Sequence, residues 1–304
     1  MENNLRWSAL TALAPVAWGA NYWVTHRYLP PGAPLWGAAL RALPAGLLLL
    51  AAARRLPRGV WWWRSAALGV LNTAAFFVLV YLASQWLPAG TAAMVMALSP
   101  LALMLCGWLL LAERPRAAQL LGGAVGIGGV VLMLAGGAGA AGPAGVLASL
   151  GALLASSVGY ALARRWSADG PGVLASTAWQ LTFGGLLLLP AAALFEGPPP
   201  ALDGGALFAF GYTSLVATAL AFLVWFAGLR RLPAAGVGLI GLLNPLTGVL
   251  LGTVLDGEPL DAARLWGIAL VPAGIALGGA RSVPGSTHRR TGSERTRPVV
   301  NSRS

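Results

Sequence analysis

The hydrophobic residues of this 304-residue chain form long uninterrupted blocks, separated by short polar or Pro- and Gly-containing stretches. About 20 apolar residues carry a helix across the ~30 Å hydrocarbon core of a bilayer. Lipid-facing strands would alternate apolar and polar residues, which runs such as 186–189 (four consecutive leucines) do not do. We therefore expect ten transmembrane helices, at residues 8–25, 35–53, 65–84, 89–112, 117–135, 144–163, 173–195, 206–229, 234–255 and 265–280.

The first block could also be a secretory signal peptide, because it follows Arg6 and contains small residues. Further hydrophobic blocks follow it at once, and the bulky Trp18, Tyr22 and Trp23 are poor neighbours for a cleavage site. A retained first helix is therefore the interpretation we adopt.

The pattern repeats at an offset of 145 residues without a gap. Matches of Leu, Ala or Gly come easily in such a composition, whereas two prolines and a glutamate in register do not. Two repeats are therefore expected, at 1–140 and 141–283, followed by a basic cytoplasmic tail at 284–304 that lacks apolar periodicity and is predicted to be disordered. The matches are Leu87-Pro88-Ala89 with Leu232-Pro233-Ala234, Pro100 with Pro245, Glu113 with Glu258, Gly122 with Gly267 and Gly129 with Gly274.

Each predicted repeat holds five helices, an odd number, so the two repeats enter the membrane from opposite sides and are related by a pseudo-twofold axis in its plane. A slightly shorter offset pairs Gly46 with Gly185 and sets Arg41 opposite Gln180. The Gly/Ala-rich stretch 136–143 is the natural linker. The expected fold class is an all-α integral membrane protein, with ten helices in two inverted five-helix repeats.

Composition and charge agree with this class. With 57% hydrophobic and 10% charged residues and a mean hydropathy of +0.73, the chain has too little polar surface for a soluble domain. Seventeen of the twenty arginines fall on loops and termini of one predicted side, while the other side has only Arg27 and Arg264. The positive-inside rule then places both termini in the cytoplasm. This topology also explains the net charge of +11, so no nucleic-acid partner is expected.

The sequence offers no set of residues for catalysis. An intramembrane enzyme needs carboxylate pairs, a His/Cys nucleophile system or metal ligands facing a cavity. His26 and His288 lie at a span end and in the tail, Cys106 is the only cysteine, and every Asp and Glu lies in a loop, turn or terminus. A Walker loop is also missing, and the chain has no Lys. We expect neither an enzyme nor a cofactor or metal site, which leaves a transporter or a non-transporting membrane scaffold or receptor.

Two features carry a resemblance to a known family. One is the Ala-Trp-Gly-Ala-Asn cluster at 17–21, and the other is a duplicated stretch that runs from a Leu-Pro-Ala turn through a central Ser99-Pro100 or Asn244-Pro245 to a Glu-containing turn. In these features the chain resembles the EamA-like transporters of the drug/metabolite transporter superfamily. The resemblance covers the whole span region. It implies a ten-helix basket in the plasma (cell inner) membrane, with a central pathway lined by both repeats and efflux of small-molecule metabolites by alternating access.

Neutral or zwitterionic substrates such as amino acids are expected, because no span interior contains Asp, Glu or His. Hydrophobic drugs are the alternative cargo.

Polar residues and prolines inside spans are the candidate substrate-binding residues. Pro100 and Pro245 disrupt the hydrogen bonds to the carbonyls of Met96 and Gly241, and these kinks either open a site or only shape packing. An Asn amide offers both a donor and an acceptor, or makes an interhelical hydrogen bond worth about 1 kcal/mol or less. The candidates are Trp18, Asn21, Asn72, Tyr81, Ser99, Pro100, Tyr160, Gln180, Trp225, Asn244 and Pro245.

The tryptophans and Arg41 each have more than one possible role. Trp18, Trp179 and Trp225 lie within spans and either line a pathway or pack against helices and lipid, whereas Trp36, 61–63 and Trp166 are expected in the interfacial belt. Arg41 is the one ionised residue clearly within a span. It either snorkels, makes a structural hydrogen bond or binds a substrate carboxylate. Small-xxx-small motifs such as Gly122/Gly126 and Gly274/Gly278 predict close helix packing but do not indicate an oligomeric state.

Overall fold

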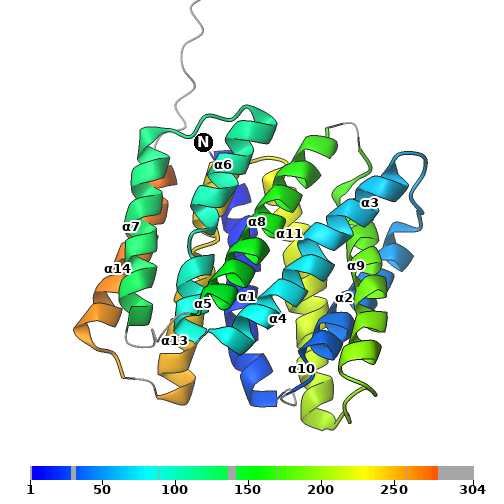
Figure 1. The fold of residues 1–304 in the computed structure, drawn as a ribbon. Coiled ribbons are helices and arrows are strands. Elements are labelled where there is room, and N and C mark those ends of the chain that lie inside the picture. Colours follow the sequence, from blue (N-terminus) through cyan, green and yellow to red (C-terminus); the bar gives the residue numbers. More distant parts are fainter. Residues whose placement is uncertain are drawn as a thin grey trace, which may run out of the picture.

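The structure is a computed structural model, and it describes residues 2–28, 32–87, 89–135, 142–168, 170–257 and 259–279. The regular elements of this part of the chain are helices (Figure 1), with two π-helical segments labelled η. They are α1 (Glu2–Tyr28), α2 (Pro34–Ala53), α3 (Trp61–Gly69), η1 (Val70–Ala74), α4 (Ala75–Trp86), α5 (Ala89–Met96), α6 (Ser99–Leu111), α7 (Ala117–Leu134), α8 (Pro143–Trp166), α9 (Val173–Phe195), α10 (Gly204–Ser214), η3 (Leu215–Leu220), α11 (Ala221–Leu229), α12 (Ala234–Ile240), α13 (Leu243–Asp256) and α14 (Ala262–Gly279).

Within the described ranges, nine helical stretches are long and apolar enough to cross a membrane, and they coincide with the second to tenth predicted blocks. The first predicted block lies in α1, which also carries Glu2, Arg6 and Arg27 and does not belong to that set. The chain is therefore an all-helical multi-pass membrane protein. A tenth span stays a prediction. Pro88, Glu258, the linker residues 136–141 and the tail lie outside the described residues.

Four of the spans are interrupted, and the interruptions correspond between the two halves of the chain. The π-helical segment η1 begins at Val70, and η3 begins 145 residues later at Leu215. Single π turns widen the backbone and are frequent at functional sites. Pro100 and Pro245, also 145 residues apart, lie in the first turns of α6 and α13, just after each span breaks. The spans that contain Pro100 and Pro245 are therefore both discontinuous, whereas other prolines lie inside unbroken helices, namely Pro15, Pro44, Pro190 and Pro272.

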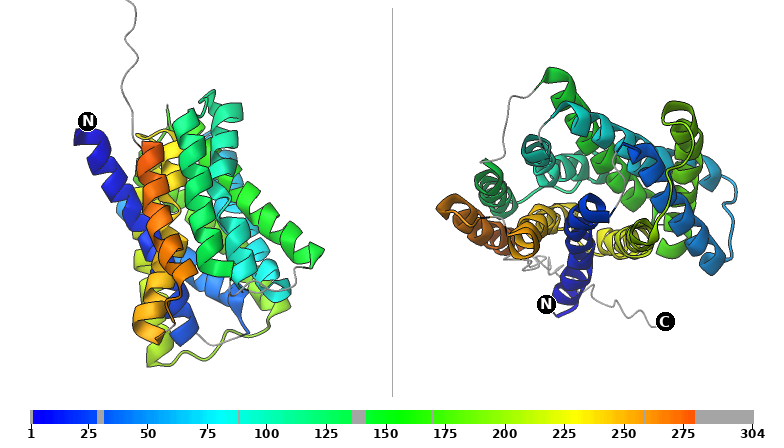
Figure 2. Two further views of the ribbon diagram at one scale, coloured as in Figure 1. Left: turned by 90° about the vertical axis from the view of Figure 1, so that its left-hand side faces the viewer. Right: turned by 90° about the horizontal axis from the view of Figure 1, so that it is seen from below.

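Helices that correspond by their order in the two halves also pack against each other. The pairs α2/α9 and α7/α14 lie at opposite edges of the bundle (Figures 1 and 2), and each pair joins one helix from each half. A Cβ at Gly185 would lie 2.7 Å from the Leu43 backbone, and one at Gly274 would lie 2.6 Å from the Gly126 amide. These glycines therefore permit the close backbone approach that the small-xxx-small motifs predict.

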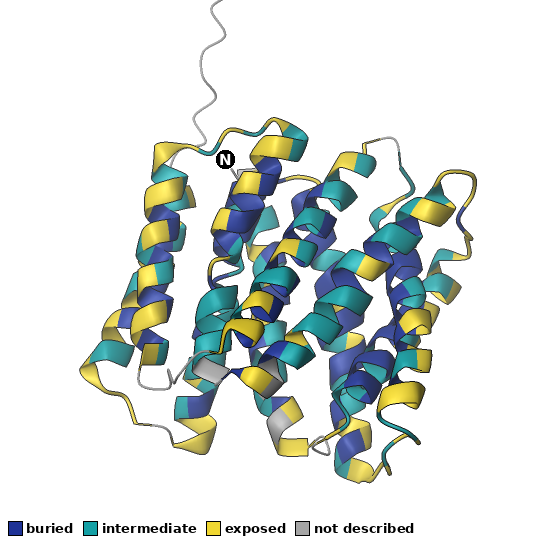
Figure 3. Ribbon diagram, in the orientation of Figure 1, coloured by how far each residue is buried: buried dark blue, intermediate teal, exposed yellow. Residues whose placement is uncertain are grey.

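The outer surface of the bundle is apolar. Leu194 and Phe195 are each 81% exposed, and exposed positions occur along the outward faces of the helices (Figure 3). The interior instead holds many alanines, including Ala42 and Ala178, both fully buried. Because lipid is as apolar as leucine, such a surface suits a bilayer, and small residues let the helices pack closely inside.

The arginine-bearing loops 54–60, 112–116 and 230–233 and the last turn of α8, which holds Arg164 and Arg165, lie at the end of the bundle where the chain begins (Figure 1). Two hydrogen bonds hold neighbouring segments together there: Trp179 Nε1 of α9 donates to the Arg55 carbonyl (2.7 Å), and Arg230 donates to the Ser167 carbonyl (3.1 Å). The predicted clustering of arginine on one face is therefore present. Which side of the membrane that face meets stays a prediction.

Candidate functional site

The candidate site lies where α1, α11 and the break between α12 and α13 meet. Gly19 makes this contact possible, because a Cβ there would come within 2.5 Å of the Asn244 carbonyl oxygen and of the Thr247 Cβ. The neighbouring Trp18 donates from Nε1 to the Ala217 carbonyl in η3 (2.9 Å). One turn of α1 is thereby joined both to the proline break and to the π-helical segment of the second half.

An aromatic cluster lines this junction. The Trp18 ring lies 5.5 Å from Phe222 and 5.2 Å from Trp225, and Tyr160 of α8 lies 5.6 Å from Trp225 and 5.8 Å from Phe226. Three predicted site residues, Trp18, Tyr160 and Trp225, are thus brought together. Phe222 and Phe226 were not predicted, although Phe222 lies three residues before Trp225 and four before Phe226 on one helix, a spacing that was available as a signal.

Three polar atoms at this junction are buried and have no hydrogen-bond partner among the described residues: Asn21 Oδ1, Asn244 Oδ1 and Trp225 Nε1. Leaving such a group unpaired costs about 1–3 kcal/mol, and each case calls for an explanation. A group that the chain itself does not supply, such as water or a substrate, would satisfy them. The two asparagine oxygens can accept hydrogen bonds, and the indole can donate one.

The first half contributes its own break to this region. A Cβ at Gly238 of α12 would lie 3.0 Å from Pro100 Cα. Pro100 is buried, and the adjacent Ser99 is half-buried. The break at Pro100 in the first half therefore packs against the α12 half-helix of the second. Pro245 is half-buried in the first turn of α13. The Gly241 carbonyl, which the proline was expected to free, accepts the Asn244 amide at 3.1 Å, so it is not left unpaired.

Each π-helical segment is bonded to the second helix of the opposite half. Asn72 of η1 donates from Nδ2 to Gln180 Oε1 of α9 (2.8 Å), and both side chains are buried. In the matching place, Arg41 of α2 donates from Nε to Thr218 Oγ1 of η3 (3.0 Å). The sequence alignment sets Arg41 opposite Gln180, but the 145-residue offset sets Asn72 opposite Ala217, the neighbour of Thr218, so the two contacts lie in similar places without being equivalent residue by residue. Asn72 and Gln180 are brought together, but with each other rather than with the aromatic cluster.

Arg41 does not snorkel away from the bundle. Besides Thr218, its Nη2 donates to the Ala217 carbonyl (3.3 Å), and its guanidinium lies 4.8 Å from the Phe77 ring. The structural hydrogen bond anticipated for this residue is therefore present. The Ala217 carbonyl accepts from Trp18 as well, which places Arg41 beside the aromatic cluster.

The remaining predicted residues lie elsewhere. Tyr81 packs against the cluster of Leu35, Trp36 and Ala192 near the start of α2. Trp179, which was a candidate pathway residue, is buried and donates to the Arg55 carbonyl, so it is a packed tryptophan.

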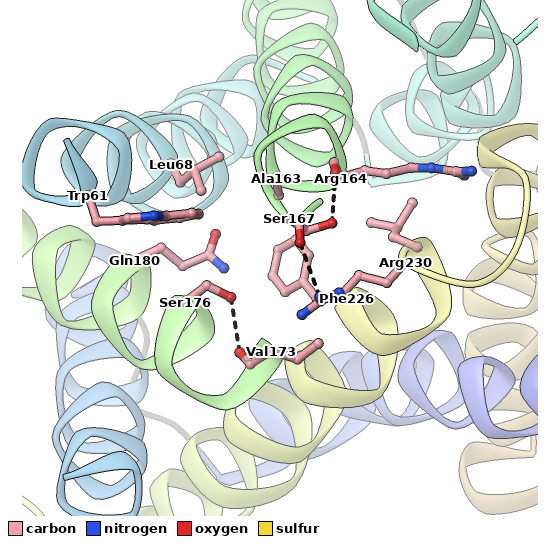
Figure 4. A pocket seen from close by; sticks show the side chains of 11 residues that line it. Trp61, Leu68, Ala163, Arg164, Ser167, Val173, Ser176, Gln180, Phe226 and Arg230 are labelled. Carbon is pink, nitrogen blue, oxygen red and sulfur yellow. Dashed lines mark hydrogen bonds between the residues drawn. The ribbon is translucent and has the colours of Figure 1, made fainter. Parts of the chain in front are cut away.

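A small pocket opens among α3, α8, α9 and α11 (Figure 4). Gln180, Trp61 and Phe226 line it, with Arg164 and Arg230 nearer the end of the bundle. Its volume of about 10 Å³ suffices for a single water molecule. A substrate could enter here only after the helices separate.

A polar clasp lies beside this pocket and joins the two halves. Glu113 forms an ion pair with Arg164, and its Oε2 accepts the Ala234 amide at 3.0 Å. Arg164 also donates to the Leu232 carbonyl. A carboxylate at the exposed amide of a helix start is favourable, here the first turn of α12. Glu113 of the first half therefore holds the Leu-Pro-Ala turn of the second.

A second, larger space of about 250 Å³ lies between α1 and the α10–η3–α11 span. Its lining is almost entirely apolar, and Tyr212, its one polar side chain, donates its hydroxyl to the Ala17 carbonyl (3.1 Å). In the described part of the chain, no three His, Cys, Asp or Glu side chains come together in a way that could hold a metal ion.

Comparisons with known proteins agree with this architecture. The model of the EamA-like transporter family matches residues 5–135 and 143–278. Protein PecM of Dickeya dadantii is 36% identical over 265 residues, 87% of this chain and 89% of that protein. The uncharacterized inner membrane transporter YedA of Escherichia coli K12 is 29% identical, covering 86% and 87% of the two chains. A Salmonella typhimurium protein named "Probable amino-acid metabolite efflux pump" is 28% identical, covering 88% and 93%.

A solved crystal structure superposes with a TM-score of 0.81 over 90% of this chain and 98% of that one, at 22% identity. At that identity the likeness shows the fold alone.

Proposed function

Because the chain belongs to the EamA-like transporter family, we propose that it exports small neutral or zwitterionic metabolites, such as amino acids, by alternating access at the junction of two inverted repeats. It is a membrane transporter and not an enzyme. In this proposal α1 also crosses the membrane, which brings the nine spans described above to ten. The repeats are residues 1–140 and 141–283, and both termini are cytoplasmic.

One observation carries the substrate class: the unpaired buried atoms Asn21 Oδ1, Asn244 Oδ1 and Trp225 Nε1. An ammonium group supplies the donors that two amide oxygens lack, and a carboxylate accepts the hydrogen bond of the indole. The rings of Trp18 and Tyr160 would contact the rest of the molecule and attract a cation. A zwitterion offers both kinds of group without bringing net charge into the membrane.

The contacts between halves support alternating access. In an inverted-repeat carrier, exchanging the conformations of the two halves opens the opposite side. The bonds Asn72–Gln180 and Arg41–Thr218 tie each π-helical segment to the other half, which would couple the movements of the two halves. The clasp of Glu113 with Arg164 and Ala234 closes one end. The amino-acid efflux named for the Salmonella relative agrees with this substrate class.

The test is efflux of a panel of labelled amino acids from proteoliposomes containing the purified protein. We expect at least one neutral amino acid to exchange across the membrane, and Asn21→Leu to reduce that exchange about tenfold, the effect of losing one hydrogen bond to a charged group. Asn4→Leu is the matched control, because Asn4 lies exposed on the same helix. Absence of flux for every solute would favour a non-transporting scaffold or receptor.

A different observation supports hydrophobic drugs as a second class of substrate. The apolar space between α1 and the α10–η3–α11 span would suit a hydrophobic drug that enters from the bilayer. Export of a lipophilic cation such as ethidium, without exchange of any amino acid, would favour that alternative.

A further inference from the structure

Arg64 is enclosed by three tryptophans at the start of the α3 span. Its guanidinium carbon lies 5.5 Å from the Trp61 ring and 5.9 Å from the Trp63 ring, both on the same helix, and 5.4 Å from Trp166 at the end of α8. Trp63 and Trp166 also contact each other, with ring centroids 5.1 Å apart. We refer to Arg64 and these three indoles as the indole cage.

The charge in this cage has no counter-charge in the part of the chain that the structure describes. Among the described residues, no carboxylate lies within ion-pair distance of Arg64, and its Nε is buried without a hydrogen-bond partner. The indoles stabilise the cation through their ring faces and restrict its orientation, but they accept no conventional hydrogen bond from it. A guanidinium held in this way remains ready to bind an anion, and its planar fork matches the oxygens of a phosphate.

The cage lies where phospholipid headgroups are found. The span Trp61–Ala83 begins at it, and Trp62 and Trp63 are 51% and 54% exposed, as interfacial tryptophans are. Arg58 and Arg165 are exposed close by in the sequence. Deeper along the same two spans, Val70 and Leu154 expose 40% and 49% of their surface, which gives an acyl chain apolar contacts below the headgroup.

We propose that the indole cage binds the phosphate of an anionic phospholipid in the leaflet at the arginine-rich end of the bundle. The headgroup phosphate pairs with Arg64, Trp62 and Trp63 border it, and the acyl chains run along the outer faces of α3 and α8. Such a lipid would tie the first half to α8 of the second.

Native mass spectrometry of the detergent-solubilised full chain, titrated with phosphatidylglycerol or phosphatidylcholine, tests the proposal. We expect the wild type to bind one phosphatidylglycerol at least about tenfold more tightly than phosphatidylcholine. Arg64→Gln should lose that preference, because about tenfold is what one charge-assisted hydrogen bond contributes. Arg64→Lys, which keeps the charge without the planar fork, should give an intermediate affinity. Arg114→Gln is the control, since it removes one exposed arginine at the same end.

Unchanged phosphatidylglycerol binding by a folded Arg64→Gln, judged by its helical circular dichroism, would overturn the site and leave the cage as a helix contact alone. Competition by inorganic phosphate at the same concentration as the lipid would also overturn the lipid assignment, because the site would then recognise a free anion. Equal losses in Arg64→Gln and Arg114→Gln would mean that net charge, and not this cage, selects the lipid.

Discussion

Replacing Asn244 by leucine separates a role in transport from a role in packing. Asn244 lies in the first turn of α13, immediately before Pro245, and its Oδ1 is buried with no partner. A residue kept for stability would be expected to use its polar atoms inside the protein. Leucine has nearly the shape of asparagine but no polar atom, so the exchange removes the unpaired acceptor without opening a cavity.

Asn244→Leu is expected to affect stability and transport in opposite directions. An unpaired buried acceptor destabilises the fold by about 1–3 kcal/mol, so Asn244→Leu should leave the free energy of unfolding unchanged or raise it, less any cost of the slightly larger side chain. A substrate ammonium bonded to Oδ1 would lose about 1.5–3 kcal/mol of binding, which is roughly a tenfold to hundredfold loss of transport at low substrate concentration.

The assay combines thermal unfolding in detergent with flux in proteoliposomes at matched protein content. Thr247→Val is the control one turn along α13, because Thr247 Oγ1 donates to the Leu243 carbonyl at 2.7 Å and is therefore paired. The control should transport normally and lose about 1 kcal/mol or less of stability. The reasoning fails if Asn244→Leu unfolds at a clearly lower temperature than the wild type, or if it transports as well as the wild type does.

Three further outcomes are expected. In a Cys106→Ser background, Asp203→Cys should react with an impermeant thiol reagent in intact cells; protection until lysis would reverse the topology. Transport should not be driven uphill by a pH gradient alone at zero membrane potential, because no span interior holds a titratable carboxylate or His. Substrate accumulation that Glu113→Gln or Glu258→Gln abolishes would show instead that a turn carboxylate couples transport to protons. Gly274→Leu should prevent the packing of α7 on α14 and cost about 3 kcal/mol or more, because a side chain there overlaps the Gly126 backbone; thermal unfolding like that of a Gly279→Leu control would contradict this.

The sequence predicts those parts of the fold that depend on the length and register of apolar blocks. A block must be about 20 residues long to span a bilayer whatever its neighbours are, so the predicted span 173–195 coincides with α9. Proline removes a backbone donor wherever it lies, so Pro100 and Pro245 marked candidate breaks, but Pro44, Pro190 and Pro272 lie inside unbroken helices, so the breaks themselves also depend on tertiary packing. The predicted duplication rests on the register of such prolines and of a glutamate along the chain.

The partners of polar side chains were not predictable, because lipid and protein interior are equally apolar and the pattern does not mark the inward face of a helix. Trp18 and Trp179 look alike in the sequence, yet one joins the aromatic cluster and the other packs against a loop carbonyl. The π-helical segments were likewise missed. No proline or glycine lies within η1, where Asn72 bonds across the bundle to Gln180, so the signal lies in tertiary contacts.

The sequence alignment pairs Arg41 with Gln180, and the difference in charge between these two residues has an electrical consequence. A unit charge that crosses the whole membrane field gains or loses about 2.3 kcal/mol per 100 mV, so a movement of Arg41 through one tenth of the field changes the energy by about 0.2 kcal/mol. Gln180, at the matching place in the other half, carries no charge and contributes nothing. In the proposed alternating-access cycle, the two halves would therefore be unequal in an energised membrane, and the voltage itself would favour one facing direction over the other.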